Sequence, residues 1–248
     1  MPTNSSTPKP QLQTLVKSPQ FAWWLGHVTL LVCSAIYLPY SLTFNSKSGS
    51  IWYSGALLGA LVSYGVVAYK SFPEIKLEAQ FLQSVFVEEN IQYLLLAFFW
   101  WRSTPRLVAL IPYMVYALFN ALNYARINLM PEGALALKIK NWTELNHDQA
   151  MLLVAYVEII GVMGTLVLQG LTFQGSLLWP IVYAFFLRFR YFFSLHTRAA
   201  FAALRTRLDA KVVGNPKIPP KAIMAYEVAR GAVIRFGMAA VKQPTASQ

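Results

Sequence analysis

Charged residues are scarce in this chain: Asp, Glu, Lys and Arg together make up 12% of its 248 residues. That is about half of their share in an ordinary soluble domain. Hydrophobic residues make up 56% and aromatic residues 15%, and the mean hydropathy is +0.44. A soluble domain of this length could not bury so much apolar surface, and a disordered chain would be more polar. The composition therefore predicts an all-α, polytopic membrane protein, because helices satisfy their own backbone hydrogen bonds in lipid.

The chain is also poor in residues that carry out chemistry. Its one cysteine, Cys33, lies within an apolar run, which excludes an intrachain disulfide. The three histidines, His27, His147 and His196, lack the spacing of metal ligands, and no nucleotide-binding or hydrolase motif occurs. We therefore expect no enzyme activity, and we assign no catalytic, cofactor-binding or metal-ligating residue.

Six apolar stretches follow residues 1–20, a polar leader that is predicted to be disordered and to hold no cleaved signal peptide. The stretches span residues 21–44, 51–69, 91–101, 107–125, 150–173 and 177–193. A membrane-crossing helix requires about 20 residues. The third stretch is therefore too short alone, and the sixth ends in Arg188 and Arg190, which we expect to reach the lipid headgroups. We favour four full spans with two shallow segments, and six segments that all cross remain the alternative.

Short and long connections alternate between these stretches, which predicts three hydrophobic helical hairpins. An even number of crossings places both termini on one side of the membrane. Residues 188–248 contain eleven basic and two acidic residues, against ten and eight in the rest of the chain, so that side is predicted to be cytoplasmic. The chain thus divides into the leader, a helical membrane domain (21–193) and a basic cytoplasmic tail (194–248). This topology also predicts that the glycosylation sequons at Asn4 and Asn141 stay unmodified.

Small residues recur at helical spacing in two of the apolar stretches. Gly55, Gly59 and Ser63 lie four residues apart, and Gly161 and Gly164 form a weaker second group. Such positions allow another helix backbone to approach closely. The partner helix is either in the same chain, which we favour, or in another protein.

Glu158 is an acidic residue in the middle of the fifth stretch. Inserting a charged side chain at membrane depth costs roughly 2.5 to 3.5 kcal/mol, so such a residue has either a functional or a helix-locking role. Asn120 and Asn123 of the preceding span are its expected neutral partners. Glu88 and Glu89 precede another stretch and fit a helix N-terminus, with pairing to the basic tail as the alternative.

The tail contains two amphipathic segments separated by a proline-rich break at residues 214–220. Such helices either pack on the membrane domain or bind a membrane surface or an acidic partner. No motif accompanies the charge that would indicate nucleic-acid binding. The residues expected at this surface are Arg198, Arg205, Ile223, Tyr226, Arg230, Val233, Arg235 and Phe236.

Three groups of residues resemble one known family when they are taken together and in order. They are Trp24-Leu25 with Cys33-Ser34-Ala35, then Phe81-Leu82-Gln83 with Glu88-Glu89 and Tyr93-Leu94-Leu95, and finally residues 174–180 (QGSLLWP) with 187–191. Over residues 21–208 the chain resembles the transmembrane protein 33 family, which includes fungal pore-membrane proteins. Glu158 also stands where that family carries a glutamate.

The resemblance implies a non-enzymatic protein of the endoplasmic reticulum and nuclear envelope. It further implies a role in nuclear pore complex assembly or distribution and in shaping tubular reticulum, with nucleoporins or reticulon-type proteins as partners. The family's basic C-terminal region is associated with membrane binding and, in fungal members, with a nuclear import receptor. The alternative function from the residues themselves is a small transporter or channel that uses Glu158; a lipid-modifying enzyme is a third, less favoured one.

Overall fold

The computed structural model describes residues 16–74, 78–130, 133–176 and 178–238, and within these ranges it contains helices and turns but no strand. This confirms the predicted all-α class. The helices are α2 (Pro19–Leu42), α3 (Ser50–Ser71), α4 (Ala79–Val87), α5 (Glu89–Trp101), α6 (Leu107–Tyr124), α7 (Ala134–Tyr156), α8 (Met163–Leu171), α9 (Leu178–Phe193), α10 (Leu195–Val212) and α11 (Pro220–Met238), with π-helical segments η1 (Ala125–Leu129) and η2 (Val157–Val162).

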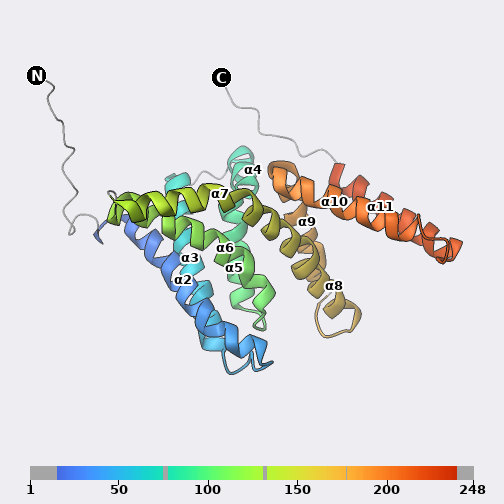
Figure 1. Ribbon diagram of the computed structural model, residues 1–248, viewed down its shortest axis with the longest axis horizontal. Coiled ribbons are helices and arrows are strands. Elements are labelled where there is room, and N and C mark those ends of the chain that lie inside the picture. The colour runs from blue at the N-terminus through green and yellow to red at the C-terminus, as the bar shows by residue number, and fades with distance from the viewer. Residues whose placement is uncertain (1–15, 75–77, 131–132, 177, 239–248) are drawn as a thin grey trace, which may run out of the picture.

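Four of the described helical segments are long and apolar enough to cross a membrane, as predicted. They are Pro19–Leu42, Ser50–Ser71, Leu107–Leu129 and Ala134–Leu171. Three antiparallel hairpins, α2–α3, α5–α6 and α8–α9, lie side by side with their tips at one end of the molecule (Figure 1). At the opposite end α7 lies across the hairpins and α4 lies beside it, while α10 and α11 start at this end and extend away to one side (Figure 1). We call these four the surface helices.

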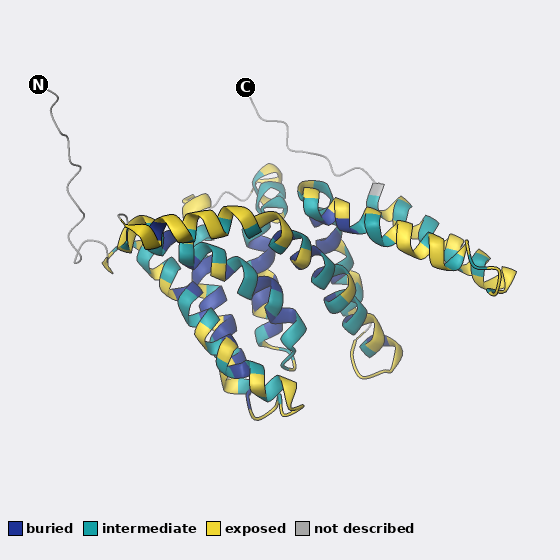
Figure 2. Cartoon of the chain, viewed as in Figure 1, coloured by how far each residue is buried: buried dark blue, intermediate teal, exposed yellow. Residues whose placement is uncertain are grey.

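Three hairpin arms are shorter than a bilayer. At a rise of 1.5 Å per residue, the 13 residues of α5 extend about 20 Å, the 9 residues of α8 about 14 Å and the 16 residues of α9 about 24 Å. The hydrocarbon core of a bilayer is about 30 Å thick. None of these arms lies flat, because each runs antiparallel to its neighbour (Figure 1). The dark blue segments of Figure 2 show that the hairpins also enclose buried residues, and α5 contributes Tyr93, Ala97 and Trp100 to the core.

Residues 126–149 were expected to form a connection between two apolar stretches, but most of this segment is helical. Ala134–Leu171 forms one continuous helical segment, in which η2 separates α7 from α8. The chain changes direction there, so that α7 lies across the hairpins and α8 descends beside α9 (Figure 1). A π-helical turn is a recognised cause of such bends. The charged residues of α7 mark a helix exposed on one face, which a mixed-charge loop resembles in sequence.

The helices α2 and α3 approach closely where glycine faces glycine. A Cβ added to Gly59 would lie 2.6 Å from the Gly26 carbonyl oxygen, and one added to Gly26 would lie 2.7 Å from that of Gly59. The Ser63 hydroxyl donates a hydrogen bond to the Trp23 carbonyl at 2.9 Å. The small-residue stripe of α3 therefore lies against α2. Gly26, the residue of α2 that faces this stripe, was not predicted from the sequence.

None of the other three small residues faces a backbone as Gly26 and Gly59 do. A Cβ added to Gly55 would lie 3.0 Å from Cys33 Sγ, and one added to Gly161 would lie 2.6 Å from a methyl group of Val108. A Cβ on Gly164 would meet nothing within 4 Å in the described chain. The spacing of glycines alone does not distinguish a contact position from an open one.

Candidate functional site

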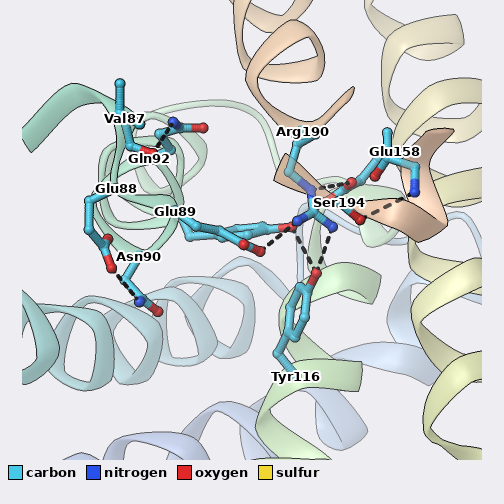
Figure 3. A network of polar contacts seen from close by, with 11 residues as sticks. Val87, Glu88, Glu89, Asn90, Gln92, Tyr116, Glu158, Arg190 and Ser194 are labelled. Carbon is cyan, nitrogen blue, oxygen red and sulfur yellow. Dashed lines mark hydrogen bonds and ion pairs between the residues drawn. The ribbon is translucent and has the colours of Figure 1, made fainter. Parts of the chain in front are cut away.

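A buried polar cluster joins the second and third hairpins. We call it the Arg190 cluster, and it consists of Glu89, Tyr93, Tyr116, Glu158 and Arg190. Glu158 is 0% exposed and Arg190 is 5% exposed. Arg190 and Glu158 approach each other from α9 and η2, with Glu89 and Tyr116 on the other side of the guanidinium group (Figure 3).

Glu158 receives two hydrogen bonds. The Tyr93 hydroxyl donates to Oε1 at 2.5 Å, and Arg190 Nε donates to Oε2 at 3.3 Å. A buried carboxylate is tolerated only when it is paired and hydrogen-bonded, and this geometry supplies both conditions. The Glu158 side chain is thereby held between α5 and α9.

Arg190 uses the rest of its guanidinium group on two further partners. Nη1 donates to Glu89 Oε1 at 2.5 Å, and Nη2 donates to the Tyr116 hydroxyl at 2.8 Å. The guanidinium carbon also lies 5.7 Å from the centre of the Tyr93 ring, within range of a cation–π contact. One arginine therefore binds α5, α6 and η2 to α9 through the planar geometry that distinguishes it from lysine.

The local sequence explains where these side chains lie. Glu88 caps α5, because its Oε2 accepts a hydrogen bond from the Ile91 amide at 3.0 Å. Glu89 therefore falls in the first turn of α5, and Arg190 falls in the last turn of α9. Both ends lie on the side of the surface helices (Figure 1). The cluster thus lies toward the surface-helix end of the hairpins.

The structure corrects two expectations about this region. Asn120 and Asn123 do not contact Glu158: Asn120 Nδ2 lies 3.4 Å from His27 Nε2, and Asn123 Oδ1 accepts a hydrogen bond from Arg126 at 2.7 Å. Arg190 does not extend toward headgroups either, because its guanidinium group turns inward to the two glutamates. Glu158 and Arg190 are oppositely charged residues in two otherwise apolar stretches, and this pattern could have predicted that they pair.

The cavity beside Glu158 is small. It measures about 10 Å³ and is lined by Tyr93, Tyr113, Glu158, Tyr183 and neighbouring apolar side chains. A cavity of roughly this size has room for one water molecule, so it offers no passage for a solute. Among the described residues, no group of three His, Cys, Asp or Glu side chains could hold a metal ion.

A second set of contacts closes α10 against α11. Asp209 Oδ1 accepts hydrogen bonds from the Tyr226 hydroxyl at 2.6 Å and from Arg230 Nη1 at 2.7 Å. Arg205 Nε lies 3.5 Å from Asp209 Oδ2. The hydrogen bonds from Tyr226 and Arg230 lower the pKa of the Asp209 carboxyl group. We call these four residues the Asp209 latch.

The predicted surface of α11 is divided between two faces. Ile223, Tyr226 and Arg230 are partly buried, whereas Val233 is exposed. Met224 and Val228 are also exposed and share one side of the helix, with Val233 about half a turn of the helix away from Met224. Phe236 packs on α9, since its ring centre lies 5.4 Å from that of Phe185 and 5.2 Å from the Arg188 guanidinium carbon. Arg198 and Arg235 are exposed.

The α10–α11 hairpin also contacts α7. His196 Nε2 of α10 lies 3.2 Å from Asp148 Oδ1 of α7, and His147 Nδ1 lies 3.4 Å from the same oxygen. Two of the surface helices, α7 and α10, are therefore joined by a polar contact.

Together these features define the class: a polytopic helical membrane protein with a buried ion-pair cluster and a basic helical hairpin on one side. A family model, Transmembrane protein 33/Nucleoporin POM33, matches residues 4–239. The chain belongs to this family, which confirms the resemblance drawn from residues 21–208 and extends it through the described part of the tail.

Individual relatives agree with this assignment. Tetra-spanning protein 1 of Schizosaccharomyces pombe is 31% identical and aligns with 96% of this chain and 93% of its own length. Nucleoporin POM33 of Chaetomium thermophilum is 30% identical, with 91% and 88% covered. The Pore and endoplasmic reticulum protein of 33 kDa of Saccharomyces cerevisiae is 26% identical, with 84% and 86% covered. No solved structure matches the chain.

Proposed function

We propose that this protein shapes or stabilises curved membrane of the endoplasmic reticulum and nuclear envelope, and that it supports nuclear pore complex assembly or distribution without enzymatic activity. Family membership supports the location, because its relatives include a nucleoporin and a pore and endoplasmic reticulum protein. The geometry of the chain supports the action on membranes.

The observation that carries the proposal is the uneven distribution of helices along the membrane normal. The surface helices all lie at one end of the hairpins, whereas only short connections lie at the other (Figure 1). The short arms α5 and α9 add to this asymmetry, because neither matches the thickness of the bilayer. A protein with more cross-section in one leaflet expands that leaflet and favours curvature toward it.

The distribution of basic residues sets the proposed orientation of the molecule in the membrane. Lys47, Arg102 and Arg106 are the basic residues of the connections 43–49, 102–106 and 172–177, whereas residues 188–248 hold eleven. The surface-helix side is therefore assigned to the cytoplasm by the excess of Lys and Arg. The leader and the tail lie on that same side, and the tail (194–248) acts as a cytoplasmic membrane-binding or partner-binding unit.

Helix α11 has the chemistry to bind an anionic membrane surface. Met224, Val228 and Val233 are apolar side chains of α11 that are exposed by 60 to 68%, and Lys221 and Arg235 are exposed on the same helix. Apolar insertion combined with basic flanks is the usual pattern of interfacial helices. Nucleoporins, reticulon-type proteins and a nuclear import receptor are the proposed protein partners.

Reconstitution of the full chain tests the proposal. Vesicles of neutral and anionic lipid are formed with the protein, and their radii are measured by electron cryomicroscopy. We expect narrower vesicles or tubules with the natural chain, and wider ones when Met224, Val228 and Val233 are all replaced by glutamate. A matched control carries Ala225→Glu in place of the triple change. Equal radii for the natural chain, the triple variant and protein-free vesicles would refute a shaping role.

A further inference from the structure

Two hairpin tips share the same three residues in the same conformation. Leu42-Thr43-Phe44 follows α2, and Leu171-Thr172-Phe173 follows α8. Both phenylalanines have a left-handed backbone, with φ of 56° and 57°. We call these segments the Leu-Thr-Phe tips, and they lie at the end of the molecule away from the surface helices (Figure 1).

The hydrogen bonds of the two tips also correspond. The Thr43 and Thr172 hydroxyls each donate to the carbonyl four residues earlier, at 2.8 Å. The Phe44 amide donates to Ser41 and the Phe173 amide to Gly170, both at 3.2 Å. The amides that follow, Asn45 and Gln174, reach back five residues to carbonyls at 2.8 and 3.0 Å. This is the helix-ending motif in which the left-handed position is ordinarily glycine.

Phenylalanine is an unfavourable residue at this position. A bulky side chain with positive φ crowds its own backbone, and glycine or asparagine would relieve the crowding. Phe44 is 98% exposed and Phe173 is 91% exposed, so neither ring gains compensating contacts within the described chain. A strained aromatic residue that occurs twice without an internal partner indicates a contact outside the chain.

We propose that Phe44 and Phe173 insert into the lipid interface of the leaflet opposite the surface helices, where they fix the depth of the first and third hairpins. Phenylalanine and leucine side chains on apolar surfaces insert at that boundary between headgroups and acyl chains. The neighbouring Leu42, Leu171 and Leu178 are exposed by 61 to 68%, which extends the apolar surface of both tips. Asn45, Ser46, Gln174 and Ser176 bring no charge next to either ring.

The tip of the second hairpin lacks the Leu-Thr-Phe residues and is held by contacts within the protein. Residues 102–106 carry Arg102 and Arg106, and Arg106 donates hydrogen bonds to Gln169 of α8 at 2.8 Å and to Ser103 at 3.1 Å. The Arg106 guanidinium group thus links the second hairpin to the third.

Depth-dependent fluorescence quenching on the full chain tests the inference. In a Cys33→Ser background, one environment-sensitive label is placed at Lys47→Cys for the first tip or at Gln174→Cys for the third. Each protein is reconstituted in vesicles that contain lipids with a nitroxide near the glycerol backbone. Phe44→Gly is expected to abolish most lipid quenching at position 47 and to leave position 174 unchanged. Phe173→Gly is expected to have the converse effect, and Phe44→Trp or Phe173→Trp to preserve quenching.

Three outcomes would overturn the inference. Quenching that is unchanged in both glycine variants would show that the rings do not set the depth of the tips. A lower melting temperature of the glycine variants in detergent would show that the rings stabilise the chain itself, since relief of the left-handed strain predicts an equal or higher one. A label shielded from both the lipid nitroxide and aqueous iodide would assign the tips to a protein contact instead.

Discussion

Arg190 of α9 donates through Nε to Glu158 of η2 at 3.3 Å, and both residues are at least 95% buried. Because Arg190 also binds Glu89 at 2.5 Å, the third hairpin is held to the second by one cation between two carboxylates. Burying charge is costly, so this arrangement specifies how the hairpins pack more than it stabilises them. The relative placement of the hairpins is what a membrane-shaping function would need to fix.

Removing Arg190 alone is expected to destabilise the protein more than replacing both Arg190 and Glu158. Arg190→Ala leaves the buried carboxylate of Glu158 without a cation, which costs about 3 to 5 kcal/mol. Glu158→Ala is expected to cost less, because Arg190 keeps its ion pair with Glu89. The double change Glu158→Leu with Arg190→Leu is expected to recover most of that loss. Unfolding in mixed micelles, followed by tryptophan fluorescence, measures these free energies.

The exposed pair Lys140–Glu144 is the matched control. Its atoms lie 3.9 Å apart at positions i and i+4, and Lys140→Ala is expected to cost about 0.5 kcal/mol or less. If the double variant lost as much stability as the two single variants added together, Arg190 and Glu158 would not act as a pair.

The glycines of the first hairpin offer a second test. Gly59→Ala places a methyl group 2.6 Å from the Gly26 carbonyl oxygen, so α2 and α3 must separate, at a cost of about 1 to 3 kcal/mol. Gly65→Ala on the same helix meets nothing within 4 Å and is expected to stabilise by a few tenths of a kcal/mol to about 1 kcal/mol. Thermal unfolding of the two variants in detergent compares them directly, and equal melting temperatures would contradict the close approach.

The α10–α11 hairpin is expected to loosen in acid. Hydrogen bonds from Tyr226 and Arg230 lower the pKa of Asp209 in the folded protein. The Asp209 latch therefore contributes its stability above the carboxyl group's unfolded pKa, near 4, and loses it as the pH falls through the lower folded value. Hydrogen exchange of α11, measured between pH 3 and pH 7, reports the opening.

Two substitutions separate the latch from general acid effects. Asp209→Asn removes the titrating group, so exchange of α11 is expected to be faster and no longer to depend on this transition. Glu227→Gln on the exposed side of α11 serves as the control and should keep the natural profile. An unchanged pH profile in Asp209→Asn would exclude Asp209 as the titrating group.

Composition and periodicity predicted the features of the fold that depend on local sequence. The four long spans and the three hairpins follow from hydrophobic length and from short polar connections. The helical character of α7 could not be predicted in this way, because Lys138, Lys140 and Glu144 on an exposed helix face give the same mixed-charge pattern as a loop. Its bend at η2 depends on tertiary packing, which composition does not encode.

The candidate site was predicted in part. Glu158 was identified because an acid in an apolar stretch is unusual, but its partner was sought on the preceding span. Arg190 lies 32 residues further along and was assigned to the headgroups because it is near a helix end. The two side chains meet because η2 and the last turn of α9 lie at the same membrane boundary, a relationship set by helix lengths in three dimensions. Gly26 was missed for a similar reason: a lone glycine has no spacing pattern.

Orientation in the membrane gives the last prediction. Positive charge on the surface-helix side predicts that α7 faces the cytoplasm and that the tip after α2 faces the lumen. In a Cys33→Ser background, Lys140→Cys should react with a membrane-impermeant maleimide in sealed microsomes, whereas Lys47→Cys should react only after permeabilisation. Asn141, which is exposed on α7 within a glycosylation sequon, should stay unmodified, so glycosidase treatment should not change the mobility of the protein. Labelling of position 47 alone in sealed microsomes would invert the topology, and the leaflet expanded by the surface helices would then be the luminal one.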